Sequence, residues 1–192
     1  MMQTKPLLHS TTHPTPVGAL TLVASDQGLR AILWPRLSPA RAGIHPIPRR
    51  TLDHPILTRT AAQLDEYFAG SRTTFEIPLD LQGTRFQLAA WRSLARIPFG
   101  TTTTYGQQAA ALGIPKAARA LGAANGANPV CIVLPCHRVI GADGSLTGFG
   151  GGLPTKQWLL DHEASVLASS IVSTPEWPHQ QPLQTRLSMP VA

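Results

Sequence analysis

The chain has 192 residues, of which 43% are apolar and only 14% are charged. This length allows one ordinary domain or two small ones with a hydrophobic core, and the composition excludes a largely disordered chain. No apolar run approaches the length of a membrane helix, and the first residues lack the apolar stretch of a secretory signal, so we expect a cytoplasmic protein with no membrane partner. The formal net charge of +6 is compatible with a polyanionic partner, but the basic residues are spread along the chain and do not by themselves indicate one.

Residues 1–79 are predicted to form a small α+β unit. We expect residues 1–16 to be mobile, since the ends of domains are often poorly ordered. In Val17–Trp34, two runs of apolar and smaller residues flank Asp26-Gln27-Gly28. This pattern predicts a β-hairpin with its turn at those three residues.

The rest of this unit is predicted to contain one helix and one edge strand. Residues 35–50 are rich in Pro and Arg, which indicates a loop. Asp53 is predicted to cap a helix that continues through Phe68, because apolar residues recur between them at helical spacing. Phe75–Leu79 alternates as a strand, and the proline within it favours an edge position. Nothing in this unit suggests a functional site.

The second unit, residues 80–167, is predicted to be mostly helical. Its first three helices each follow a capping residue or a proline that can open a helix. They are predicted to run from Thr84 to before Pro98, from Thr104 through Leu112, and from Pro115 through Asn125. The last two are separated by a tight turn, which is the outline of a helix-turn-helix.

The end of the second unit combines a buried segment with a final helix. Val130–Leu134 is apolar and lies between two prolines, which predicts a short buried strand. Pro154–Glu163 is predicted to be helical, and residues 168–192 are expected to form a disordered tail. The fold class is therefore mixed α/β, more exactly an α+β unit followed by a mostly helical one.

The chain has two cysteines, Cys131 and Cys136. Two thiols make no disulfide framework, and their spacing matches no zinc motif, so both are expected to be reduced. Cys131 is expected to be a small buried residue. Cys136 is followed by His137, which can take the proton of the thiol and leave the reactive thiolate. Glu163 is a candidate to orient that imidazole, although a residue near a helix end can also be merely solvated.

Several short motifs around Cys136 occur in a fixed order, and together they resemble the O6-alkylguanine-DNA alkyltransferases. The resemblance extends from about Leu81 to Glu163, whereas residues 17–79 are similar to the N-terminal domain of that family only in outline. The segments that carry it are Phe99-Gly100, Tyr105-Gly106, Lys116–Gly122, Asn128–Val130, Leu134–Gly141, Thr147–Gly152 and Lys156–Glu163.

This resemblance implies a role for each residue of the site. Cys136 accepts the alkyl group, His137 deprotonates it through a water, and Glu163 orients His137. A positive imidazole there is expected to lower the pKa of the thiol. Asn128 holds the turn that joins the second helix of the helix-turn-helix to the site. Tyr105 hydrogen-bonds the guanine, although its position also fits an ordinary core residue.

The resemblance also implies contacts with double-stranded DNA that contains O6-alkylguanine. Arg119 is implied to fill the gap left when the damaged nucleotide is flipped out, although a phosphate contact is the commoner role of such a residue. The residues implied to contact DNA are Ala118, Arg119, Ala120, Gly122, Asn125, Phe149 and Gly150. The protein is expected to be a monomer, and cooperative binding and repair of O4-alkylthymine are left open.

The sequence departs from the family in two places. Phe149 stands where many members have tyrosine, so the hydrogen bond of that hydroxyl is lost. Some relatives bind zinc through cysteines and histidines of the N-terminal domain, but this N-terminal unit has no cysteine. We therefore expect neither that metal site nor a cofactor.

A thioether on Cys136 would resist hydrolysis, so the resemblance implies a protein that reacts once. Two other classes remain open. One is a cysteine hydrolase that uses Cys136 and His137 as a dyad. The other is a module that senses alkylated bases without repairing them, like the alkyltransferase-like proteins, which lack the acceptor cysteine.

Overall fold

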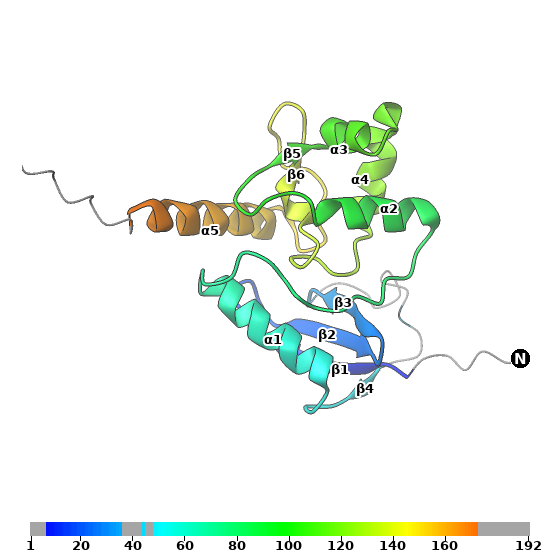
Figure 1. Cartoon of the computed structure of the whole chain (residues 1–192), viewed down its shortest axis with the longest axis vertical. Helices are drawn as coiled ribbons and strands as arrows, with labels where there is room; N and C mark the ends of the chain where they lie inside the picture. The colour runs from blue at the N-terminus through cyan, green and yellow to red at the C-terminus, as the bar shows by residue number, and fades with distance from the viewer. Residues whose placement is uncertain (1–6, 36–43, 45–47, 173–192) are drawn as a thin grey trace, which may run out of the picture.

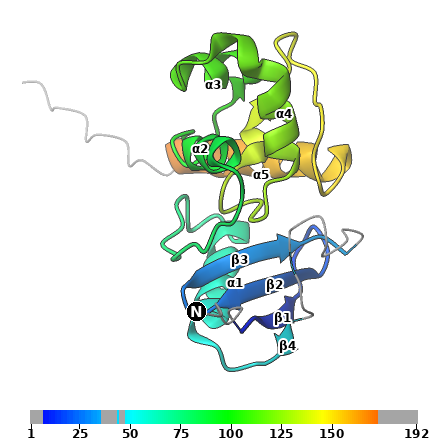
Figure 2. The same cartoon turned by 90° about the vertical axis from the view of Figure 1, so that its right-hand side faces the viewer.

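The computed structural model describes residues 7–35, 44 and 48–172, and it is built from two units (Figure 1). The N-terminal unit is a small β-sheet with helix α1 on one face. The C-terminal unit gathers helices α2–α5 around a short two-stranded sheet. Figure 2, turned by 90°, shows the same division, with the sheet on one side and α2–α5 on the other.

The N-terminal sheet has the order β3-β2-β1-β4. The predicted hairpin is confirmed as β2 (Leu20–Ser25) and β3 (Gly28–Leu33), which pair antiparallel. β1 (His9–His13) pairs antiparallel with β2, and β4 (Arg49–Arg50) pairs parallel with β1. The prediction that residues 1–16 are mobile is therefore wrong for β1. Its sequence HSTTH has no apolar alternation, so only its pairing with β2 makes it a strand.

Helix α1 (Pro55–Phe68) packs against this sheet through apolar residues such as Leu57 and Leu64. Its N-cap is His54 rather than the predicted Asp53, because Pro55 occupies the first helical position and needs no hydrogen-bond partner there. The predicted strand Phe75–Leu79 is wrong: only Leu79 forms a bridge, with Leu29.

The predicted helices of the C-terminal unit are present. α2 (Arg85–Leu94) begins with a capping box at Thr84, and α3 (Tyr105–Ala111) begins with another at Thr104. Pro115 opens a short 3-10 helix, Pro115–Ala117, that leads into α4 (Ala118–Gly126). Helices α3 and α4 pack against each other on the side of α2 away from the N-terminal sheet.

The predicted strand Val130–Leu134 is wrong, although the segment is largely buried as expected. It forms a tight turn in which Leu134 N–H donates to Val130 O at 2.9 Å and Ile132 has a φ of 75°. An apolar run of five residues between two prolines can form either a buried turn or a buried strand, and the sequence pattern alone does not tell which. The turn leads into a 3-10 helix, Cys136–Arg138.

Two further elements complete the unit. β6 (Val139–Ile140) pairs parallel with β5 (Thr103–Thr104), a pairing the sequence did not predict. α5 (Leu153–Val172) is longer than predicted, so residues 168–172 are helical and not part of a disordered tail. Residues 173–192 lie outside the described part. Within that part, no helix is both long enough and apolar enough to cross a membrane.

One hydrophobic core joins the two units. It includes Leu22, Trp34 and Tyr67 from the first unit and Trp91 and Leu159 from the second. Cys136 belongs to the same cluster. Cys136 therefore lies in the core that the two units share.

Candidate active site

Cys136 is buried, with 5% of its surface exposed, at the start of the 3-10 helix Cys136–Arg138. The preceding turn is closed by the side chain of Asn128, whose Nδ2 donates to Leu134 O at 2.7 Å and whose Oδ1 accepts from Val130 N at 3.1 Å. This turn brings Cys131 Sγ to 3.7 Å from Cys136 Sγ. Asn128 thus holds the loop that positions both thiols, and Cys131 is more than an inert core residue.

His137 and Glu163 are both fully buried and meet across 26 positions of sequence. His137 Nε2 lies 2.8 Å from Glu163 Oε1. A carboxylate can only accept, so Nε2 carries the hydrogen and Nδ1 keeps its lone pair. Among the described residues Nδ1 has no hydrogen-bond partner. The imidazole is therefore oriented with a free basic nitrogen.

Glu163 has three further donors that the sequence did not reveal. Arg138 donates from Nη2 to Oε1 and from Nε to Oε2, both at 2.9 Å. Gly100 N–H donates to Oε2 at 2.8 Å, and the Tyr67 hydroxyl donates to Oε1 at 2.8 Å. Arg138 lies inside the Pro-Cys-His-Arg element and could have been suspected. Tyr67 comes from the first unit, 96 positions away, and no sequence signal points to it.

These contacts set the charges of the site. Burial opposes ionisation of Glu163, but the hydrogen bonds from His137 and Arg138 outweigh it and lower the pKa of Glu163 to about 2. Burial lowers the pKa of His137, despite the opposing effect of Glu163. The imidazole is thus neutral near pH 7, the form that can accept a proton.

The pKa of Cys136 is lowered, mainly by the hydrogen bond with Cys131 and against the effect of burial. The side chain of Asn128 and the charge of Lys156 add to this lowering. Lys156 is fully buried and donates from Nζ to Val139 O and Thr147 O at 2.6 and 2.8 Å. The expected cause, a positive imidazole at His137, is therefore wrong: the neighbouring thiol and the buried lysine stabilise the thiolate.

Replacing Cys131 by Ala should raise the pKa of Cys136. In the neutral pair Cys136 Sγ donates to Cys131 Sγ, and Cys131 Sγ donates to Asn128 O. Once Cys136 is a thiolate, only Cys131 still has a thiol proton to donate, and alanine removes it. The rate of thiol alkylation rises with pH as the thiolate forms. We expect the rising limb of that profile to move to higher pH, with a rate at pH 7 about 3- to 10-fold lower if the hydrogen bond contributes about 1 kcal/mol. Cys131→Ser, which keeps a hydroxyl donor, should restore part of the loss. Superimposable profiles for wild type and Cys131→Ala would contradict this role.

The loop after β6 lies over the site. Phe149 packs edge-on against Trp34, with ring centroids 5.5 Å apart, and lies 6.5 Å from His137. Gly150 follows it and is exposed. Tyr105, half-buried at the start of α3, has its hydroxyl 3.4 Å from Thr147 O of the same loop. Trp34 contacts the loop at Phe149, and Tyr105 contacts it at Thr147.

Helix α4 carries most of the residues predicted to contact DNA. Arg119 and Ala120 are exposed, and Ala118 and Gly122 are half-buried. Asn125 is different: it is buried, and its Nδ2 donates to Gln108 Oε1 of α3 at 2.7 Å. Its side chain joins the two helices and is not presented at the surface, so the assignment of Asn125 to DNA contact is wrong.

Comparison with known proteins agrees with this arrangement. Residues 8–81 match the family model described as "6-O-methylguanine DNA methyltransferase, ribonuclease-like domain", and residues 85–165 match "6-O-methylguanine DNA methyltransferase, DNA binding domain". The chain is 48% identical over 148 residues to the methylated-DNA–protein-cysteine methyltransferase of Mycolicibacterium paratuberculosis, covering 76% of this chain and 86% of that protein.

Other relatives are similarly close. The methylated-DNA–protein-cysteine methyltransferase of Shigella flexneri is 42% identical over 160 residues, which cover 80% of this chain and 94% of that protein. The crystal structure of Mycobacterium tuberculosis OGT in complex with DNA is similar with a TM-score of 0.75 and 42% identity, over 82% of this chain and 94% of that one. The chain belongs to the 6-O-methylguanine DNA methyltransferase family.

Proposed function

We propose that this protein repairs alkylated DNA by transferring the alkyl group of O6-alkylguanine to its own Cys136. The observation that carries the proposal is the buried Cys136 beside His137, whose Nε2 is held by Glu163. The matching family models and relatives support the same reaction class. The proposed partner is double-stranded DNA, bound by a monomer.

In the proposed reaction the thiol proton of Cys136 passes to His137 Nδ1, directly or through a water. The thiolate attacks the alkyl carbon, a C–S bond forms, and the bond between that carbon and guanine O6 breaks. The guanine, which stays in the DNA, takes up one proton through the hydroxyl of Tyr105, and the proton that Cys136 gave to His137 balances it, so the base departs neutral. Tyr105 is the proposed hydrogen-bond partner of the guanine ring, and Phe149 provides an apolar wall.

In the proposed reaction each protein molecule accepts one alkyl group and is not regenerated. Its product is a thioether, which has no acyl carbon for water to attack. O6 and the alkyl carbon are inside the stacked duplex, so the nucleotide must first be flipped out. We assign Arg119, exposed on α4, to fill the vacated place in the stack. The remaining proposed DNA contacts are Ala118, Ala120, Gly122 and Gly150.

Intact-protein mass spectrometry after incubation with O6-methylguanine DNA tests this function. We expect one added methyl per chain, found on Cys136 by peptide mapping, and no further O6-methylguanine converted to guanine in the DNA once every chain is modified. Cys136→Ser should gain no methyl, whereas Cys131→Ala should still gain one. Methyl on Cys131 in the wild type, or several guanines restored per chain, would contradict the proposal.

A further inference from the structure

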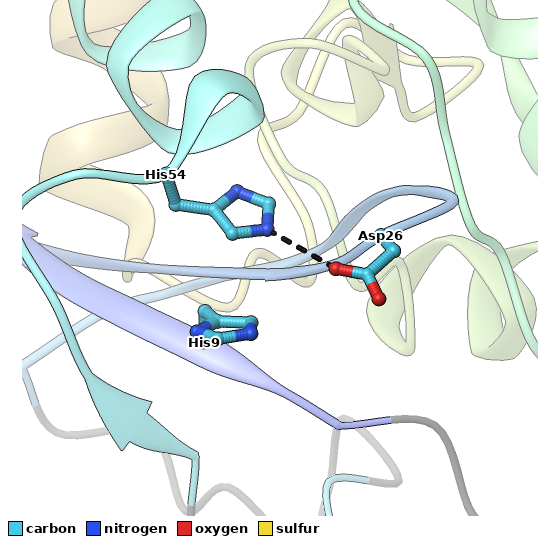
Figure 3. Close-up of side chains that lie close together, drawn as sticks. All are labelled: His9, Asp26 and His54. Carbon is cyan, nitrogen blue, oxygen red and sulfur yellow. Dashed lines mark ion pairs between the residues drawn. The ribbon is translucent and has the colours of Figure 1, made fainter.

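The N-terminal unit brings together three side chains that the proposed repair reaction does not use. They are His9 of β1, Asp26 of the turn between β2 and β3, and His54, the N-cap of α1 (Figure 3). One nitrogen or oxygen of each lies within 4.8 Å of the others. Three separate elements thus place two imidazoles and one carboxylate at one point.

The contacts within this cluster are incomplete. The two imidazole rings have centroids 4.7 Å apart with a tilt of 32°. His54 Nε2 is 3.7 Å from Asp26 Oδ1, which is too far for a direct hydrogen bond. His54 is 7% exposed, and its Nδ1, like that of His9, is buried with no hydrogen-bond partner among the described residues. The nitrogen of His54 that faces Asp26 is Nε2, and the other ring nitrogen points away from the cluster (Figure 3), so it is Nε2 and the nearby Asp26 carboxylate that leave a gap for a ligand.

We propose that His9, Asp26 and His54 bind a divalent transition-metal ion of the Zn²⁺ class. Two imidazoles and a carboxylate suit such an ion better than Mg²⁺ or Ca²⁺, which prefer oxygen ligands. Zinc bonds of about 2.0–2.2 Å in tetrahedral geometry place the ligand atoms about 3.4 Å apart. The present separations of up to 4.8 Å must therefore shorten by no more than about 1.4 Å. Asp26 is exposed and can rotate, and its open side leaves room for a water as fourth ligand.

The proposed ligand set contains no cysteine, so it differs from a site of cysteines and histidines. The sequence predicts no metal here because the three residues lie far apart and match no ligand spacing. A bound ion would connect β1, the hairpin turn and the start of α1, and would therefore stabilise the N-terminal unit. This inference does not depend on the proposed alkyl transfer.

Titration of the full-length protein with Zn²⁺ by calorimetry tests the site, with Co²⁺ as a spectroscopic probe. We expect one ion per chain, a rise in Tm on adding Zn²⁺, and Co²⁺ d–d bands without a thiolate charge-transfer band. Asp26→Asn should weaken binding at least tenfold, because it removes a charged ligand from an exposed turn with little effect on folding. His9→Gln should do the same.

His13→Ala is the matched control, since His13 lies on the same strand but its ring contacts Asp65 at 2.8 Å outside the cluster. Its affinity for Zn²⁺ should equal that of the wild type. The proposal is overturned if no ion binds, if Co²⁺ shows a thiolate band, if Asp26→Asn binds as tightly as the wild type, or if His13→Ala weakens binding equally.

Discussion

Glu163→Gln should lower the free energy of unfolding by about 3–5 kcal/mol and slow alkyl transfer at least tenfold. The loss of stability follows from Arg138, which is buried and donates to both carboxylate oxygens. An amide leaves that guanidinium without a counter-charge, and its NH₂ group faces donors instead of acceptors. Such a change is a large fraction of the total stability of an ordinary domain.

The lowered pKa of Glu163 gives a similar value for the loss of stability. It also defines the pH range over which this loss is expected. The fall from an ordinary 4.5 to about 2 corresponds to roughly 3 kcal/mol. A lowered carboxylate pKa stabilises the folded state above the unfolded-state pKa, and this contribution is lost as pH falls through the folded value. The difference in the free energy of unfolding between wild type and Glu163→Gln should thus have its full size above about pH 4.5 and shrink as the pH falls towards 2.

Urea unfolding and transfer rates on folded protein measure both effects. Asp161→Asn is the matched control, since Asp161 is exposed on the same helix and its hydrogen bond is with Gln157. It should change stability by no more than about 0.5 kcal/mol. Tyr67→Phe removes one hydrogen bond to the carboxylate of Glu163. Its free energy of unfolding should lie between those of Glu163→Gln and Asp161→Asn. We expect DNA affinity to be nearly unchanged in Glu163→Gln. Equal stability of Glu163→Gln and Asp161→Asn would show that the buried pair contributes nothing.

Arg119→Ala should slow repair of duplex DNA about 10- to 100-fold while barely changing reaction with free O6-alkylguanine base. Flipping a nucleotide costs a few kcal/mol of lost stacking, and each 1.4 kcal/mol is about a factor of ten in rate. Arg119 is exposed on α4, and its side chain makes no hydrogen bond or ion pair with the rest of the described chain. Its planar cation is therefore available to occupy the place of a base.

Lys116→Ala is the control for simple attraction, because Lys116 is an exposed basic residue just before α4. If it contacts a phosphate, its loss should weaken binding to all DNA and reduce the salt slope by about one, without a selective effect on the duplex rate. The decisive quantity is the ratio of mutant to wild-type rate on each substrate. Equal ratios on duplex and free base would rule out a role of Arg119 in extrusion.

Local patterns in the sequence predicted the elements whose signals lie within a few residues. The hairpin, the helix caps at Thr84 and Thr104 and the helices of the second unit have such signals, and they are present. The order of motifs around Cys136 also sufficed to identify the family, because it depends on residue identity rather than conformation. Strand β1 has no such local signal, so it was predicted as mobile and is ordered only by pairing with β2.

The electrostatics of the site depend on contacts between distant segments. Tyr67 reaches Glu163 across 96 positions, and the lowered pKa of Cys136 depends on a turn that was predicted as a strand. The same is true of His9, Asp26 and His54, which match no ligand spacing in the sequence yet lie together in space. Hydrogen bonds and burial depend on distance in space, which the order of residues does not specify. The sequence therefore determined which groups can react, and only the tertiary structure decided which neighbours set their charge.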